Sequence, residues 1–222
     1  GYTAEYKPSK ISELQRLAYD RTKPFERDIR YYNSYVPLLS VKKPEAYVIP
    51  QCWQRVIERL RANGVMMTRI KNDTTISVES SYIDDYKTGQ RAYEGHYVHS
   101  NVKLRTEKQD IHFLKGDYIV STNQSSVRYI VETLEPQATD SYFNWGFFDA
   151  ILQQKEWFSD YVFEDMAEDM IKKDNSLKQK LEDAKAKDST MVNNHFQQLY
   201  FIYKNSPYFE KSYLRYPVYR LN

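Results

Sequence analysis

The stretch AYVIPQCWQRVIERLRANGVMMTRI, residues 46–70, decides the fold that the sequence predicts. Its first four residues form an apolar run of the kind found in buried strands. Four apolar residues then recur at the spacing of one helix face: Trp53, Val56, Ile57 and Leu60. Gly64 can end this helix in a left-handed conformation, and a second apolar run follows at 65–70. Strand, helix and strand in so short a stretch predict a βαβ unit in a partly parallel sheet.

The residues after this stretch alternate between apolar and polar up to about Val120, which is typical of antiparallel strands. The charged run Thr106–Asp110 resembles the loop of a β-hairpin. A further strand is expected at Tyr118–Val120, and Ser125 is a suitable N-cap for a helix after it. This helix should end before Pro136, since proline cannot continue a helix.

Three regions follow from this pattern. Residues 1–45 contain four prolines and little periodicity, so we expect an extended linker or arm that packs on the domain. Residues 46–140 should form an α/β domain with a β-hairpin insertion. Residues 141–222 should form a helical C-terminal subdomain with an extended tail. The predicted fold class is therefore α/β, in the mixed α+β sense: a small partly parallel sheet, an antiparallel hairpin and C-terminal helices.

Composition excludes several classes of protein. The 222 residues are 41% hydrophobic and 15% aromatic, which is typical of a globular chain. The net charge of +2 comes without a concentrated basic stripe, so we expect no nucleic-acid partner. No apolar run is long enough to span a bilayer, and a polar start leaves no signal peptide in this segment. The single cysteine, Cys52, excludes an internal disulfide.

The densest group of aromatic residues lies between Tyr142 and Phe158. If this segment is a helix, Tyr142, Trp145 and Phe148 share one side, and two further phenylalanines share another. Two aromatic sides exceed what one core face covers, so part of the group is expected to form a docking surface for another domain. The alternative is a platform that binds peptide or stacks on sugar rings, because the chain is rich in Tyr and Trp.

Arg128 is a further candidate for ligand binding, since it lies in the first turn of a predicted helix, where anions bind. An ion pair with Glu132, four residues later, would explain Arg128 without a ligand. Glu132 and Glu135 share a helix face and could act as acid and base. On so acidic a segment we expect both of them to be solvated instead.

The histidines and the cysteine of the sequence are considered as metal ligands and as a nucleophile. His96 and His99 are three apart, which places them on opposite faces of a strand, and His112 lies on another predicted strand. We therefore expect no metal site in this chain. Cys52 lies between a strand and a helix, where a nucleophile could be exposed. However, its bulky neighbours argue against the strained turn of a nucleophile elbow and favour a buried, structural cysteine.

Several segments together resemble one protein family: KGDYIVSTNQSSVRYIVETLEPQATDSYFNWGFFDAILQQKEWFSDYVFED (115–165), KPEAYVIP (43–50), NSPY (205–208) and RYPVYRL (215–221). The chain resembles the region C-terminal to the catalytic domain in a bacterial branch of M14-type zinc carboxypeptidases. The zinc signature of that family, His-x-x-Glu with a distant third histidine, is absent from these residues. The resemblance implies a non-catalytic part of a larger peptidase, with zinc in the missing catalytic domain. It also implies a periplasmic or secreted parent.

Three functions remain open from the sequence. The first is an accessory domain that contacts its own N-terminal peptidase domain and serves docking, stability or substrate access. The second is a module that binds carbohydrate, peptidoglycan or peptide through its aromatic residues. The third and weakest is an independent hydrolase that uses Cys52.

Overall fold

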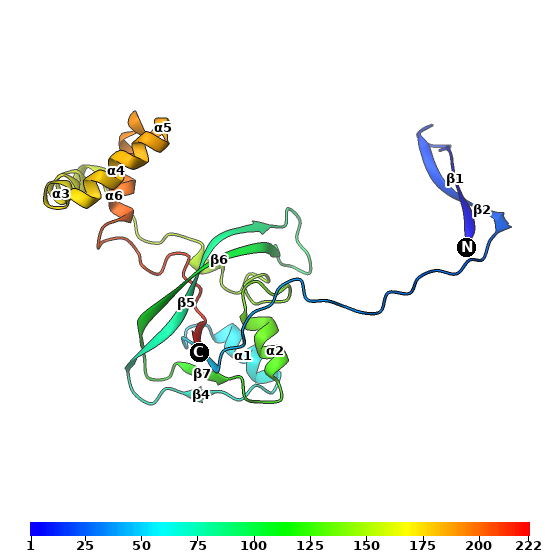
Figure 1. Ribbon diagram of the computed structural model, residues 1–222, viewed down its shortest axis with the longest axis horizontal. Helices are drawn as coiled ribbons and strands as arrows, with labels where there is room; N and C mark the ends of the chain where they lie inside the picture. Colours follow the sequence, from blue (N-terminus) through cyan, green and yellow to red (C-terminus); the bar gives the residue numbers. More distant parts are fainter. The chain divides into compact units, whose positions relative to one another are not determined.

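The computed structural model describes residues 1–222, which divide into two units, Gly1–Val41 and Lys42–Asn222 (Figure 1). In the first unit, β1 (Tyr2–Pro8) and β2 (Gln15–Pro24) pair as an antiparallel hairpin. The sequence predicted no regular structure there, because two prolines interrupt the segment. Both lie at the ends of strands, where a missing N–H group disturbs no ladder. That this region packs on the rest of the chain stays a prediction.

The second unit is built on a six-stranded sheet in the order β4-β7-β3-β8-β5-β6, and all of its pairs are antiparallel. The strands are β3 (Ala46–Ile49), β4 (Thr68–Arg69), β5 (Thr74–Thr88), β6 (His99–Phe113), β7 (Tyr118–Ser121) and β8 (Tyr219–Leu221). The mixed α+β class is therefore confirmed, but the predicted parallel pairing is wrong.

The reason is that β7 lies between the two strands expected to pair. β3 and β4 are both antiparallel to β7, so they run in the same direction, joined by α1 (Gln54–Ala62). In the same way β7 and β8 flank β3, and α2 (Val127–Leu134) follows β7. The crossover that the sequence predicted is thus present as a split βαβ unit, and the order β4-β7-β3-β8 is that of a ferredoxin-like sheet.

Strand β3 is buried on both faces, and alternation along it separates two cores. Tyr47 and Ile49 face the main core, which includes Val56, Ile57 and Leu60 of α1 and Ile130 and Leu134 of α2. Val48 faces a smaller core on the other side, formed with Ile70, Val78, Phe113 and Tyr219. Figure 1 shows α1 and α2 next to each other beside β7 and β4. Both helices cover the face of the main core because their apolar residues lie along one stripe.

Strands β5 and β6 form a long two-stranded ribbon that extends the sheet past β8, paired from Thr74↔Phe113 to Thr88↔His99. The predicted antiparallel insertion is confirmed. The predicted loop at 106–110 is wrong, because these residues lie within β6 and the turn lies between residues 88 and 99. A ribbon that is largely solvated can carry charged residues on both faces, so a charged run does not mark a turn there.

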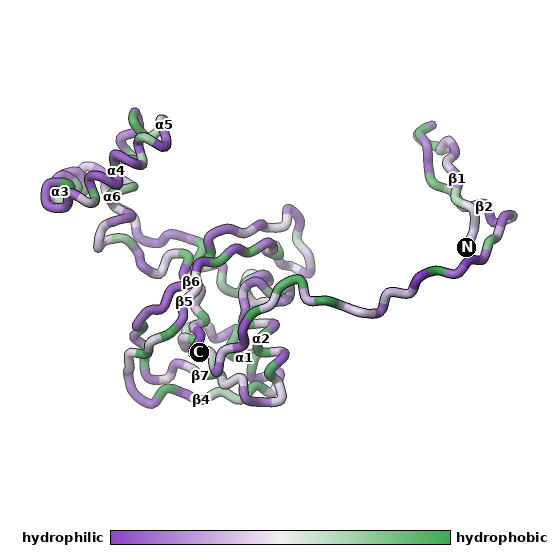
Figure 2. The backbone as a smooth tube through the Cα atoms, viewed as in Figure 1, coloured by the Kyte–Doolittle hydropathy of each residue, from purple (hydrophilic) through white to green (hydrophobic).

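The C-terminal helices form a subdomain with its own core. They are α3 (Asp160–Lys173), α4 (Asn175–Lys187), α5 (Ser189–Val192) and α6 (His195–Lys204). Their core contains Phe163, Leu177, Leu181, Leu199 and Tyr203 among other residues. The side chain of Asp174 caps α4 by accepting from the backbone N–H groups of Ser176 and Leu177. Figure 2 shows that α4 is mostly hydrophilic, as expected for a solvated helix.

Candidate functional site

The aromatic segment expected to be a helix is instead a series of turns. The only helical piece between residues 142 and 158 is a short 3-10 helix, Asp149–Ile151. Gly146 adopts φ 73°, in the left-handed region, and the backbone N–H of Phe147 donates to the carbonyl oxygen of Tyr142. The two aromatic helix sides predicted from spacing therefore do not exist. The turns direct some rings inward and others outward.

Tyr142 and Phe148, two of the predicted site residues, are core residues. Phe148 is fully buried, with its ring 4.8 Å from Trp53 and 5.1 Å from Tyr216 between centroids. Tyr142 shares a hydrogen bond of 2.7 Å between hydroxyl oxygens with Tyr129, and burial raises the pKa of Tyr142. Both side chains hold the 141–152 segment onto the sheet, so neither can contact a ligand.

Arg128 also fails to join the predicted cluster. It is exposed at the start of α2, and no hydrogen bond, ion pair or cation–π contact involves it. The alternative ion pair with Glu132 is also absent. The structure therefore brings Tyr142, Trp145 and Phe148 into one segment but leaves Arg128 apart from them.

Trp145 is half-buried and belongs to a surface that the sequence did not reveal. We call Arg55, Arg59, His96, Trp145 and Phe147 the aromatic–arginine face. The guanidinium carbons of Arg55 and Arg59 lie 5.3 and 4.5 Å from the centroid of the Phe147 ring. The His96 ring lies 5.6 Å from Trp145 and stacks 6.0 Å from Phe147.

The chemistry of this face combines flat rings with free cations. Neither Arg55 nor Arg59 forms an ion pair with a carboxylate. Cation–π contact with Phe147 orients both guanidinium groups. One N–H group of Arg59 donates to the carbonyl oxygen of Arg55 at 3.1 Å, and the other N–H donors of the two guanidinium groups stay available. Such a face can stack on a sugar or aromatic ring and donate hydrogen bonds to a carboxylate at the same time.

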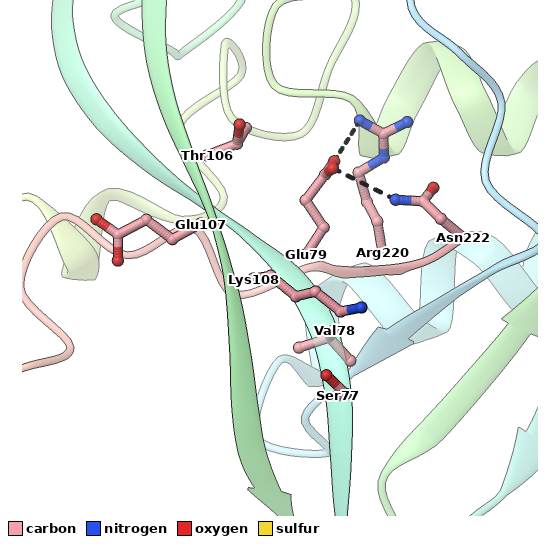
Figure 3. Close-up of a pocket in the computed structure, with 8 residues that line it drawn as sticks. All are labelled: Ser77, Val78, Glu79, Thr106, Glu107, Lys108, Arg220 and Asn222. Carbon is pink, nitrogen blue, oxygen red and sulfur yellow. Dashed lines mark hydrogen bonds and ion pairs between the residues drawn. The ribbon is translucent and has the colours of Figure 1, made fainter.

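A second polar feature lies where β8 meets β5 and α2. The guanidinium of Arg220 forms an ion pair with Glu79 at 2.8 Å (Figure 3). The Nε of Arg220 also lies 3.5 Å from Glu135. Tyr47 donates its hydroxyl to Glu135 at 2.6 Å. Glu135 is buried, so the expectation that it is solvated is wrong, whereas Glu132 is exposed. Burial raises the pKa of Glu135, although Tyr47 and Arg220 oppose this shift.

Beside this network is a polar cleft of about 360 Å³. Figure 3 shows Glu79, Arg220 and Asn222 together on one side of it, joined by two contacts of Glu79. Because Arg220 and Glu79 already pair with each other, they leave little free charge for a ligand. We interpret this cluster as a structural tie between the C-terminal strand, α2 and the sheet.

The histidines do not converge. His99 is buried, with Nδ1 2.9 Å from the Thr88 hydroxyl and Nε2 2.9 Å from Asp149. His112 is exposed beside Thr75 on the ribbon, and His96 lies on the aromatic–arginine face. Across residues 1–222, no group of three or more His, Cys, Asp and Glu side chains could hold a metal ion. The donor set of this chain therefore does not fit the zinc of a carboxypeptidase.

Cys52 is exposed, so the expectation of a buried cysteine is wrong, but its environment does not activate it. Partial burial of the sulfur raises the pKa of the thiol, and the carboxylate of Asp117 raises it further. A reactive cysteine needs the opposite, a positive environment that stabilises the thiolate. This geometry disfavours a nucleophilic role for Cys52.

Comparison with known proteins points to carboxypeptidases. Carboxypeptidase 2 of Trichophyton rubrum is 29% identical over 110 residues, which cover 50% of this chain and 20% of that protein. Carboxypeptidase 2 of Trichophyton tonsurans is 28% identical over 109 residues, 49% of this chain and 20% of that protein. Probable carboxypeptidase 2 of Arthroderma benhamiae is 27% identical over 103 residues, which cover 46% of this chain and 19% of that protein. No family model and no solved structure matches.

The chain thus contains a region similar to part of fungal proteins that are named carboxypeptidase. It spans about a fifth of the length of these relatives. This confirms the coarse expectation of a carboxypeptidase-related region. The relatives are fungal, so the bacterial branch suggested by the sequence gains no support from them. No helix of the structure is long and apolar enough to cross a membrane.

Of the aromatic–arginine face, sequence reasoning proposed Trp145 as a site residue, counted Phe147 in the aromatic group and considered His96 only as a metal ligand. It missed Arg55 and Arg59. Arg55 and Arg59 are four apart on α1, which places them on the same helix side, away from the buried stripe. This spacing was the only sign in the sequence that the two arginines act together. It could not reveal their contact with Phe147, which is about ninety residues away and is brought to α1 only by the fold.

Proposed function

We propose that this chain is an accessory, non-catalytic region of a larger zinc carboxypeptidase of the M14 type. The observation that carries the proposal is the similarity to about a fifth of proteins named carboxypeptidase 2. The catalytic zinc would be held by another part of the parent, for which this region serves docking, stability or substrate access. An exported parent, periplasmic or secreted, is part of the proposal and rests on the sequence resemblance alone.

Two measurements test this role. First, the coding sequence upstream of Gly1 should encode a His-x-x-Glu motif and a later histidine ligand. Second, the parent should release C-terminal residues from acyl-peptides in a zinc-dependent reaction, whereas the purified 1–222 chain should release none, with or without added zinc. Chelator-resistant release by the 1–222 chain, lost in a Cys52→Ser variant, would overturn the proposal and favour the independent hydrolase.

A second candidate is a binding module, which the aromatic–arginine face favours. Two guanidinium groups without an ion pair, beside half-buried rings, would hold a glycan or peptide near the parent's active site. Titration of the chain with soluble oligosaccharides, followed by Trp fluorescence, tests this candidate. Trp145→Phe should weaken such binding, whereas Trp157→Phe, on an exposed residue of the helical subdomain, should not. Equal effects of the two variants would remove the face as a binding site.

A further inference from the structure

The hairpin of the first unit has an apolar face that nothing in its own unit covers. Residues two apart on a strand share a face, so Ala4 and Tyr6 of β1 lie on one face with their partners on β2, Tyr19 and Leu17. Tyr6, Leu17 and Tyr19 are between 46% and 73% exposed. None of residues 1–41 belongs to a hydrophobic core. A two-stranded hairpin is at best marginally stable in water, whereas three or more strands with a hydrophobic face can be stable.

The outer edge of β2 is better suited to a further strand than the outer edge of β1. β1 and β2 form a two-stranded sheet of their own, so each has one free edge (Figure 1). β1 ends at Pro8, which has no backbone N–H group to offer to a neighbour. On β2, residues 15–20 pair with β1 in unbroken register, and Pro24 lies outside this stretch. A regular exposed edge of this kind is a template for pairing with another chain.

Arg16 occupies an unfavourable position in the isolated hairpin. It lies directly opposite Lys7 of β1, and like charges in opposite positions destabilise a pair of strands. Lys7 has a partner in Glu5, at 3.0 Å, whereas Arg16 has no ion pair. The guanidinium of Arg16 therefore has N–H donors free for a carboxylate on the outer side of β2.

Asp20 provides a carboxylate on the same face of the same strand. Its side chain accepts hydrogen bonds from the backbone and hydroxyl of Thr22 and lies 3.2 Å from the ammonium of Lys23. Each oxygen of a carboxylate has two lone pairs, so Asp20 can accept a further donor. One copy of β2 thus presents a cation and a carboxylate four residues apart.

This arrangement is complementary to itself in one register. When two copies of β2 run antiparallel with Ala18 opposite Ala18, Arg16 of each copy lies opposite Asp20 of the other, and Leu17 lies opposite Tyr19. A two-fold axis repeats each of these pairs, as in any isologous interface. Centring the pair on Arg16 or Asp20 would instead place like charges opposite each other. Centring it on Leu17 or Tyr19 would leave Arg16 opposite an uncharged residue.

We propose that the chain forms a two-fold dimer in which the outer edges of β2 pair antiparallel about Ala18. The free backbone N–H and C=O groups of the two strands bond to each other, as in other cases of strand addition. The two hairpins become one four-stranded sheet with its apolar residues on a single face, which meets the strand number that an isolated hairpin lacks. The dimer is a property of this chain alone, so its test does not depend on whether the parent is a peptidase.

The first test is sedimentation of the 1–222 chain between about 10 μM and 1 mM, a range that reveals weak dimers. The mass should rise from 26.6 kDa toward twice this value. R16D and D20R should each weaken the dimer at least about tenfold, because each places like charges opposite each other twice. The double variant R16D/D20R should restore it to within about threefold of the wild type. R30D, which makes the same charge change as R16D outside the strands, should stay within about twofold.

A cross-linking test reads the register directly and keeps both charges in place. In a Cys52→Ser background, Ala18→Cys should form a disulfide-linked dimer on mild oxidation, because opposite Cβ atoms of paired strands lie about 4.5–5.5 Å apart. Gln15→Cys is the matched control on the same strand. In the proposed register its two copies lie about 20 Å apart, so it should cross-link much more slowly.

Three results would overturn the proposal. A 1–222 chain that stays monomeric at every concentration would leave the edge of β2 to a different protein. Equal weakening by R16D and R30D would show a response to net charge alone. Faster cross-linking of Gln15→Cys than of Ala18→Cys would show that the copies meet in another register.

Discussion

Glu135 shows how a single carboxylate can join distant parts of the chain. It accepts the hydroxyl of Tyr47 from β3 and lies against Arg220 from β8, while Arg220 also pairs with Glu79 of β5. Glu132, one turn earlier on α2, is exposed. The spacing of three residues placed both on one helix side, but the boundary between core and solvent passes between them. Only the position of β8, at the end of the chain, determines which one is buried.

Glu135→Ala should therefore lower the free energy of unfolding by about 3 kcal/mol or more, because it leaves the Tyr47 hydroxyl and the Arg220 guanidinium without a buried partner. Glu132→Ala is the matched control on the same helix and should change it by no more than about 0.5 kcal/mol. Urea unfolding of both variants measures the difference. Equal effects would mean that the buried network does not stabilise the sheet.

The same carboxyl group should make stability depend on pH. Burial raises the pKa of Glu135 above its ordinary value of 4.5, so the folded chain binds a proton more tightly than the unfolded chain does. The stability that comes from this tighter proton binding is fully present below the ordinary pKa and is lost as the pH rises through the raised pKa of the folded chain. The free energy of unfolding of the non-titrating variant Glu135→Gln should therefore rise relative to that of the wild type between these two pKa values. Above the raised pKa the difference between the two proteins should stay constant. Urea unfolding at a series of pH values checks this, and a difference that falls with pH would contradict it.

At the scale of elements, local patterns were predictable and long-range partners were not. The apolar stripes of α1 and α2 each consist of residues three or four positions apart within one short segment. Both helices were therefore expected at nearly the observed positions. The parallel pairing failed because β7, which separates β3 from β4, follows both of them in the chain. Of the candidate site residues, Trp145 alone reaches a plausible ligand surface. Its neighbours Arg55 and Arg59 come from another element, so spacing could not connect them.

The 141–152 segment provides a prediction at this scale. Phe148→Ala should lower the free energy of unfolding by about 3–5 kcal/mol, because the ring is fully buried against Trp53 and Tyr216. Trp145→Ala should lower it by only about 1–2 kcal/mol, since part of the indole is already in water. Guanidinium unfolding of the two variants gives the comparison. A larger loss for Trp145 would show that the indole, and not the phenyl ring, anchors the segment.

At the scale of the whole molecule, the chain divides into two units of unequal structure. Residues 42–222 contain all three apolar cores, while residues 1–41 expose Tyr35, Leu38 and other apolar side chains almost completely. Exposed apolar residues along a segment are typical of a surface that is covered by a partner. If the chain is the accessory region proposed above, residues 29–39 would contact the parent's other domains.

Removal of residues 1–41 tests this division. Because the three cores lie in the second unit, the 42–222 chain should fold with a free energy of unfolding within about 0.5 kcal/mol of the 1–222 chain. In the parent protein, the paired replacement of Tyr35 and Leu38 by Ser should lower stability, whereas in the 1–222 chain it should have no effect. Urea unfolding of both proteins measures this. A loss above about 2 kcal/mol on truncating the isolated chain would instead support the sequence-based expectation that the arm packs on its own domain, because each buried large apolar side chain contributes about that much.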